Sequence, residues 1–133
     1  MQMDQFTGNL VNIGNPHFIV FRDDLEDKPH LLWGSFLEHH TAFEKSVNVH
    51  FAKVISPNQI EMKIWENAVG ETYACGTGAA STVCAGRALG LLEDRVSIQM
   101  PGGKVQISCD SNGDYHLIGP VSYTGKGFYQ WKV

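Results

Sequence analysis

The residues best suited to chemistry are a cysteine and the small residues after it, in the segment Cys75-Gly76-Thr77-Gly78. The two glycines leave backbone N–H groups unshielded at what we expect to be the first turn of a helix. The first amides of a helix lack intrahelical partners and the helix dipole adds positive potential, so such a turn binds anions. In that field the thiolate of a cysteine is favoured over its thiol. The segment therefore predicts a Cys75 thiol that is reactive near neutral pH.

The helix that should follow has an unusual composition for a surface helix. Residues 79–90 are small or apolar apart from one charge, Arg87. Little of such a helix can face water, and small side chains on every side suit a helix that other structure encloses closely. We therefore predict a buried central helix that presents Cys75 at its N-terminus.

Short alternating segments separated by turn residues surround this helix. Pro29 fits the first turn of a second helix, expected over residues 29–38, with an apolar face of Leu32, Trp33, Phe36 and Leu37. Strands are expected at residues 9–13, 17–21, 46–54, 59–65, 96–100, 104–109, 115–118 and 128–132. In the strand at 46–54, Val47, Val49 and Phe51 alternate with Asn48 and His50, and in the strand at 59–65, Ile60, Met62 and Ile64 share one face. This pattern predicts an α+β fold, a mostly antiparallel sheet rolled around one buried central helix.

Composition limits the class of protein. The 133 residues suit a single domain, residues 1–133, and a net charge of -4 argues against a nucleic-acid partner. No apolar run reaches the roughly 18 residues of a membrane span, and the first residues do not resemble a signal peptide. We therefore expect no membrane partner. Three cysteines without framework spacing favour a reducing, cytoplasmic location.

Several polar residues have a structural as well as a functional interpretation. Asn15 fits a turn, Glu66 alone would be a solvated strand end, and Asn48 lies in a strand where asparagine is uncommon, which favours a task for its side chain. Cys84 and Cys109 fit small buried positions. No Cys/His spacing matches a zinc site, so no metal is predicted; the histidines expected at the surface are His30, His39, His40 and His116.

Three functional classes can be compared at this point. The glycine segment lacks the Gly-Lys-Ser/Thr ending of a phosphate-binding loop. A cysteine hydrolase would need a histidine base near Cys75, for which His17 and His50 are the candidates. An acid–base role for Cys75 would need a substrate carboxylate on the helix amides and a Cα–H directed at sulfur.

The motifs, taken together, resemble the second half of the diaminopimelate epimerase family. The segment Thr72-Tyr73-Ala74-Cys75-Gly76-Thr77-Gly78-Ala79, preceded by Glu66 and Gly70, resembles its cysteine signature. Three further segments occur in the order that the family shows, so the resemblance covers nearly the whole chain: Gly14-Asn15-Pro16-His17, Val47-Asn48-Val49 and Pro101-Gly102-Gly103. The family consists of cofactor-independent isomerases with two pseudo-symmetric halves, each a sheet rolled around a central helix.

This resemblance implies a two-base mechanism on a small amino-acid substrate with no cofactor. One cysteine removes the α-proton, and a second cysteine on the opposite face returns one. It implies that Cys75 is one acid/base, with Glu66 and His17 beside it and the substrate α-amino group. The implied substrate-binding residues are Gly76 and Thr77, whose amides would hold the α-carboxylate, together with Asn15, Asn48, Glu66 and the position of Asn67.

The chain departs from the family in two ways. Asn67 stands where the family has an arginine that contacts the distal carboxylate of diaminopimelate, so a related amino-acid racemase and a non-catalytic fragment stay open as alternatives. The second cysteine would belong to an N-terminal half absent from this sequence. That half, in the same polypeptide or a separate chain, is the expected partner, and a homodimer is the alternative.

Overall fold

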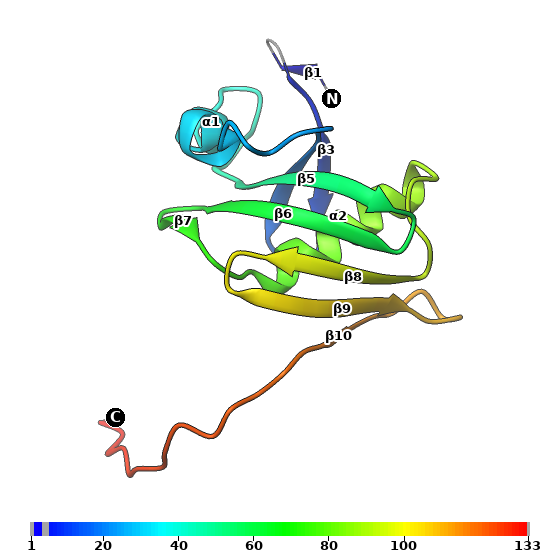
Figure 1. Cartoon of the computed structure of the whole chain (residues 1–133). Helices are drawn as coiled ribbons and strands as arrows, with labels where there is room; N and C mark the ends of the chain where they lie inside the picture. Colours follow the sequence, from blue (N-terminus) through cyan, green and yellow to red (C-terminus); the bar gives the residue numbers. More distant parts are fainter. Residues whose placement is uncertain (1, 4–5, 133) are drawn as a thin grey trace.

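The computed structural model describes residues 2–3 and 6–132, in which the chain forms two helices and ten strands (Figure 1). Neither helix is long and apolar enough to cross a membrane. The strands are β1 Gln2–Met3, β2 Phe6–Thr7, β3 Asn9–Asn12, β4 Pro16–Phe21, β5 Asn48–Ser56, β6 Gln59–Glu66, β7 Gly70–Thr72, β8 Arg95–Met100, β9 Gly103–Cys109 and β10 Tyr115–Ile118, and the helices are α1 Pro29–Glu38 and α2 Gly76–Ala88.

Eight of the strands form one curled, mixed sheet. Its order is β10-β9-β8-β6-β5-β4-β3, with β7 paired to the end of β6. Hairpins join most neighbours, so five of its seven pairings are antiparallel, as predicted. The other two, β4 with β5 and β6 with β8, are parallel because a helix lies between the paired strands in the chain. The sequence pattern did not predict these two parallel pairings.

The two faces of the sheet have separate cores. Along β6, Ile60, Met62 and Ile64 face one core, which includes Ala79 and Val83 of α2. The second core contains residues of β4, β5 and α1, among them Phe18, Leu37, Val49 and Phe51, together with Val47 just before β5. Because side chains alternate along a strand, the intervening residues of β5, Asn48 and His50, belong to the α2 face. The predicted alternation of β5 is confirmed, and its polar residues Asn48 and His50 are buried as well.

Helix α2 is only partly enclosed, unlike the expected central helix. Its buried residues are Gly78, Ala79, Ser81, Thr82, Val83, Ala85 and Gly86. Gly76, Thr77 and Ala88 are exposed, and Ala80, Cys84 and Arg87 are half-buried. The path of paired strands begins at β10 and ends at β3, so the described sheet does not close around the helix. An open depression lined in part by Ile13, Ala80, Cys84, Tyr115 and Leu117 lies along this side of α2.

Helix α1 begins and ends where the sequence predicts, but it buries a different face. Gly34 packs directly on the Trp65 ring, where an added Cβ would lie 2.4 Å from Trp65 Cγ. The close approach turns Leu37 and Glu38 inward, whereas Leu32 and Phe36 are exposed. The predicted apolar face is therefore wrong for Leu32 and Phe36.

The last segment of the chain forms no strand. Residues 119–132 have no regular secondary structure and run away from β10 (Figure 1), and Phe128 and Trp131 are fully or largely exposed. The strand predicted at residues 128–132 is thus wrong for this chain. An alternating apolar segment becomes a strand only when it pairs with another strand, and the described chain supplies none.

Candidate active site

Cys75 lies at the N-terminus of α2, as predicted. Its backbone is extended (φ -148°, ψ 107°) and its carbonyl accepts the first helical hydrogen bond, from the Ala79 N–H at 2.9 Å. The thiol caps the helix, because Sγ accepts a hydrogen bond from the Gly78 N–H at 3.3 Å and lies 3.6 Å from Thr77 Oγ1. Gly76 and Thr77 are exposed at the same turn. The sulfur is therefore held in the field of the first helix amides.

Two histidines lie beneath this turn. His17 on β4 and His50 on β5 are fully buried, and their Nδ1 and Nε2 atoms, respectively, form a hydrogen bond of 2.8 Å. Their rings stack with centroids 5.1 Å apart. One nitrogen of each ring and Cys75 Sγ all lie within 4.8 Å of one another. The structure thus brings together Cys75 and both histidines that the sequence offered as neighbours of the thiol.

Glycine at position 78 makes this packing feasible. A Cβ added there would lie 2.3 Å from His50 Cε1 and 2.6 Å from His50 Nε2. The absence of a side chain lets the first turn of α2 rest directly on the imidazole. Gly78 therefore does more than expose an amide, since it sets the distance between the helix and β5.

Burial controls the protonation of the histidine pair. It lowers the pKa of His50 to about 3, with a smaller contribution from His17. It also lowers the pKa of His17, which the Glu66 carboxylate partly offsets. Both rings are consequently neutral near pH 7, so one ring donates and the other accepts the proton of their hydrogen bond.

The pKa of the Cys75 thiol is shifted in the opposite direction to the one predicted from the sequence. Burial raises its pKa and Glu66 raises it further, whereas hydrogen bonds from Thr77 and Gly78 lower it. The predicted effect of the helix terminus is present, but loss of solvation is larger. The chain thus favours the protonated thiol, and the predicted thiolate near neutral pH is wrong.

Glu66 is placed by a strand that the sequence analysis missed. Strand β7 folds back on the end of β6, and Thr72 Oγ1 on β7 donates a hydrogen bond of 2.7 Å to Glu66 Oε1. The same carboxylate influences the pKa of both His17 and Cys75. The available signal in the sequence was Gly70, because a glycine shortly after the end of a strand marks a possible turn; in the structure it pairs with Glu66 and has a φ of 99°.

The turn that follows Glu66 is held by buried Glu38 from α1. Glu38 accepts hydrogen bonds from the Ala68 N–H at 2.7 Å and from Trp65 Nε1 at 2.8 Å. These bonds hold Ala68 in a left-handed conformation with φ at 61°. The second core thus positions one side of the candidate site, a contribution that local sequence pattern does not reveal.

The predicted asparagines lie around the same turn in different settings. Asn48 donates from Nδ2 to the Pro16 carbonyl at 3.0 Å and accepts from the Asn67 N–H at 2.9 Å. The Asn48 side chain therefore has a structural task, because it joins the start of β4 to the turn after β6. Asn67 is exposed and its Nδ2 lies 3.4 Å from the Ser46 carbonyl oxygen, while Asn15 is half-buried in its turn.

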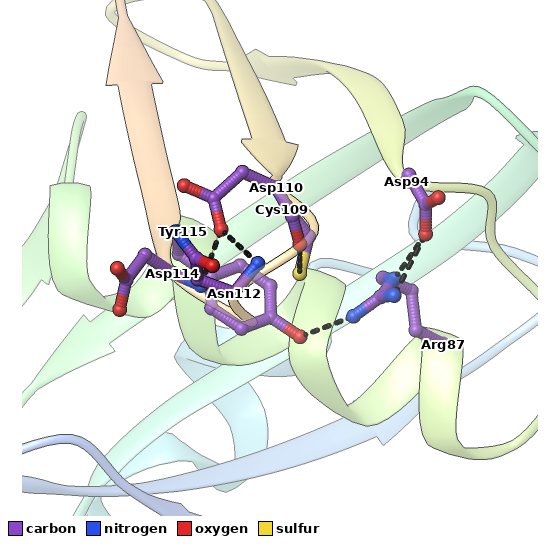
Figure 2. Close-up of polar contacts among 7 residues, drawn as sticks. All are labelled: Arg87, Asp94, Cys109, Asp110, Asn112, Asp114 and Tyr115. Atoms are coloured by element: carbon purple, nitrogen blue, oxygen red, sulfur yellow. Dashed lines mark hydrogen bonds and ion pairs between the residues drawn. The ribbon is translucent and has the colours of Figure 1, made fainter.

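The far end of α2 is anchored by a polar cluster (Figure 2). Arg87 donates to Asp94 Oδ1 at 2.7 and 3.0 Å and to the Tyr115 hydroxyl at 2.9 Å. Asp110 Oδ1 accepts from the backbone of Asn112 and Asp114, which shapes the turn before β10. These contacts attach β10 to the helix and contribute to its orientation.

Comparison with solved structures first defines the class of fold. A phenazine biosynthesis protein of the PhzF family from Bacillus anthracis aligns with a TM-score of 0.55 at 22% identity, covering 84% of this chain and 38% of that chain. A phenazine biosynthesis protein of the same family from Enterococcus faecalis aligns with a TM-score of 0.58 at 11% identity, covering 74% and 35% respectively. At these identities the likeness shows the fold alone.

Sequence comparison then defines the family. Residues 9–125 match diaminopimelate epimerase. The diaminopimelate epimerase of Prochlorococcus marinus (strain MIT 9313) is 47% identical over 112 residues, which are 84% of this chain and 37% of the relative; that of Halothermothrix orenii is 41% identical over 120 residues, 89% and 42% respectively. The chain belongs to the diaminopimelate epimerase family, and it spans less than half the length of these relatives. The predicted resemblance is confirmed.

Proposed function

We propose that this chain carries one of the two proton-transfer sites of a cofactor-independent amino-acid epimerase that acts on diaminopimelate. The observation that carries the proposal is the position of the Cys75 thiol at the N-terminus of α2, beside His17 and close enough to Glu66 for this carboxylate to raise the pKa of the thiol. Family membership supports the same reaction class. A second thiol on the opposite face of the substrate belongs to the other half of the enzyme.

In the proposed reaction the substrate α-carboxylate binds at the exposed first turn of α2, where the amides of Gly76 and Thr77 stabilise negative charge. One thiolate removes the α-proton and the opposite thiol delivers another. The raised pKa of Cys75 suits it to the delivering role. In the reverse direction Cys75 must first lose its proton. The substrate ammonium group beside Glu66 would help, because it offsets the negative charge that raises the pKa of the thiol.

The geometry disfavours a cysteine hydrolase. Such an enzyme uses a nearby histidine to take the thiol proton and form a thiolate. Here burial lowers the pKa of both histidines and raises the pKa of the thiol, so each imidazole is a weak base toward the thiol proton. The proximity of His17 and His50 to sulfur therefore does not supply the ion pair that nucleophilic attack needs.

A chimera tests the proposal directly. This sequence would replace the matching segment of the Prochlorococcus marinus relative, and conversion of L,L-diaminopimelate would be followed. Cys75→Ser should reduce the rate by about 10²–10⁴-fold, the usual contribution of a general acid or base. Cys84→Ser is the matched control and should retain activity. A folded chimera that epimerises equally fast with and without the Cys75 thiol would contradict the proposal.

One observation favours a second candidate, a racemase for another amino acid. Asn67 is exposed and its side chain lies near the Ser46 carbonyl, so it offers no cationic contact to a distal carboxylate. The same chimera should therefore be tested on amino acids that lack this carboxylate. Faster inversion of such a substrate than of diaminopimelate would favour the racemase.

A further inference from the structure

Three side chains of the candidate active site are of types that can bind a metal ion. Cys75 Sγ and one nitrogen each of His17 and His50 lie within 4.8 Å of one another, and they come from α2, β4 and β5. Thiolate and imidazole are both common ligands of Zn²⁺ in proteins, and one thiolate with two imidazoles is also a set that holds copper. Their separation in sequence explains why no local Cys/His spacing indicated a site.

A second observation concerns the unused nitrogens of the imidazoles. His17 Nε2 and His50 Nδ1 are buried and, within the described residues, have no hydrogen-bond partner. A buried polar atom without a partner loses its hydration with no compensation. An ion bound by these two nitrogens would give each of them a partner, whereas an ion bound by the other two would replace the 2.8 Å hydrogen bond between the rings.

The required geometry is close to the one observed. Zinc–nitrogen distances of about 2.0–2.1 Å and a zinc–sulfur distance of about 2.3 Å place tetrahedral donors roughly 3.3–3.6 Å apart. Donors within 4.8 Å therefore need to approach by between roughly 1 and 1.5 Å at most. Cys75 is half-buried, which leaves a route for the ion from the exposed first turn of α2.

Charge around the cluster also fits a divalent cation. The Cys75 thiolate supplies one negative charge, and the Glu66 carboxylate at the end of β6, which accepts a hydrogen bond from Thr72, supplies another. Together they balance the two positive charges of the ion. Gly78 leaves the space that the His50 ring occupies beneath the helix.

We propose that His17, His50 and Cys75 bind a single thiophilic divalent cation, of which Zn²⁺ is the natural example, with the fourth position open to water. Binding converts the thiol to a metal thiolate and releases its proton. The inference does not depend on the proposed epimerase activity. If that activity is correct, the bound ion inhibits it by occupying the lone pair with which Cys75 accepts the proton.

Cobalt(II) is a suitable probe because its spectrum reports geometry and sulfur ligation. The 133-residue chain would be titrated with Co²⁺ under argon, and Zn²⁺ would then be added. We expect one Co²⁺ per chain, intense visible bands of a four-coordinate ion, a near-ultraviolet thiolate charge-transfer band, and loss of all bands as Zn²⁺ displaces Co²⁺. Zinc should also protect Cys75 from alkylation by iodoacetamide, read by mass spectrometry.

Matched variants assign the ligands. Cys75→Ser should abolish the charge-transfer band, and His50→Gln should weaken Co²⁺ binding by more than the roughly 10–100-fold that loss of an outer-shell partner costs. Cys84→Ser and His116→Gln should bind as the parent does. Circular dichroism would show whether His50→Gln folds; if it does not, His17→Gln replaces it. A parent spectrum of octahedral Co²⁺, or a charge-transfer band that survives Cys75→Ser, would overturn the proposal.

Discussion

The contact between α2 and the buried histidine pair can be tested by adding one carbon atom. In Gly78→Ala the new Cβ would lie 2.3 Å from His50 Cε1, 2.6 Å from Nε2 and 3.0 Å from Nδ1. The imidazole is fully buried and hydrogen-bonded to His17, so it has little room to withdraw. Gly76→Ala is the matched control in the same turn, because its Cβ would meet only the end of the Leu117 side chain at 3.2 Å.

The difference between the two variants isolates the cost of this contact. Both exchanges gain a similar amount, up to about 1 kcal/mol, from the lower backbone entropy of alanine in the unfolded chain and its higher helix propensity. Overpacking a rigid core site costs about 1–3 kcal/mol. Gly78→Ala should therefore be less stable than Gly76→Ala by about 1–3 kcal/mol in free energy of unfolding.

Urea denaturation followed by tryptophan fluorescence measures this difference. The thermal midpoint of a domain of this size should fall by roughly 4 °C for each 1 kcal/mol. Gly78→Ala should also change the rate of Cys75 alkylation, since the displaced histidine lies beneath the thiol. A Gly78→Ala variant as stable as Gly76→Ala would show that the helix does not rest on His50 as described.

Three further predictions concern the turn after β6 and the isolated thiol. Glu66→Gln removes a negative charge that raises the pKa of Cys75, so alkylation by iodoacetamide in the presence of a chelator should begin at lower pH than in the parent; an unchanged pH profile would contradict this. Ala68→Gly should raise the free energy of unfolding by about 0.5–1 kcal/mol in urea denaturation, because alanine is strained at a φ of 61°; a loss of stability would be inconsistent. Finally, the purified chain incubated with L,L-diaminopimelate in deuterium oxide should not invert the substrate at an enzyme-like rate, because one sulfur cannot reach both faces of a bound Cα; inversion that Cys75→Ala abolishes would show that a second copy or another residue supplies the missing base.

Much of the fold was predictable because its elements are short and strongly patterned. The alternation of Ile60, Met62 and Ile64 gave the correct face of β6, and Pro29 gave the start of α1. The parallel pairing of β4 with β5 was not accessible in this way, since it depends on how α1 crosses between them. Likewise, the pattern of residues 128–132 predicts a strand, but whether the segment forms one depends on a partner strand.

The candidate site shows a similar division. Local sequence located Cys75 at a helix start and drew attention to Asn48. The pairing of His17 with His50 follows from adjacent strands brought together across 33 positions of sequence, which no local pattern contains. The sign of the thiol pKa was also out of reach, because it depends on the balance between burial and hydrogen bonds in the folded chain.

The balance between burial and hydrogen bonds at Cys75 bears on which of the two thiols starts the proposed reaction as acid and which as base. A helix terminus alone would make Cys75 a base, but burial and Glu66 keep it protonated despite two hydrogen bonds to sulfur. Two thiols that exchange protons across one Cα work best when their environments give them different pKa values, so that one starts as base and the other as acid. In the proposed reaction Cys75 would start as the acid, because burial and Glu66 raise its pKa, and the opposite thiol would start ionised. Substrate binding reverses the roles only if the ammonium group offsets the charge of Glu66, which makes this carboxylate the link between substrate binding and the protonation of Cys75.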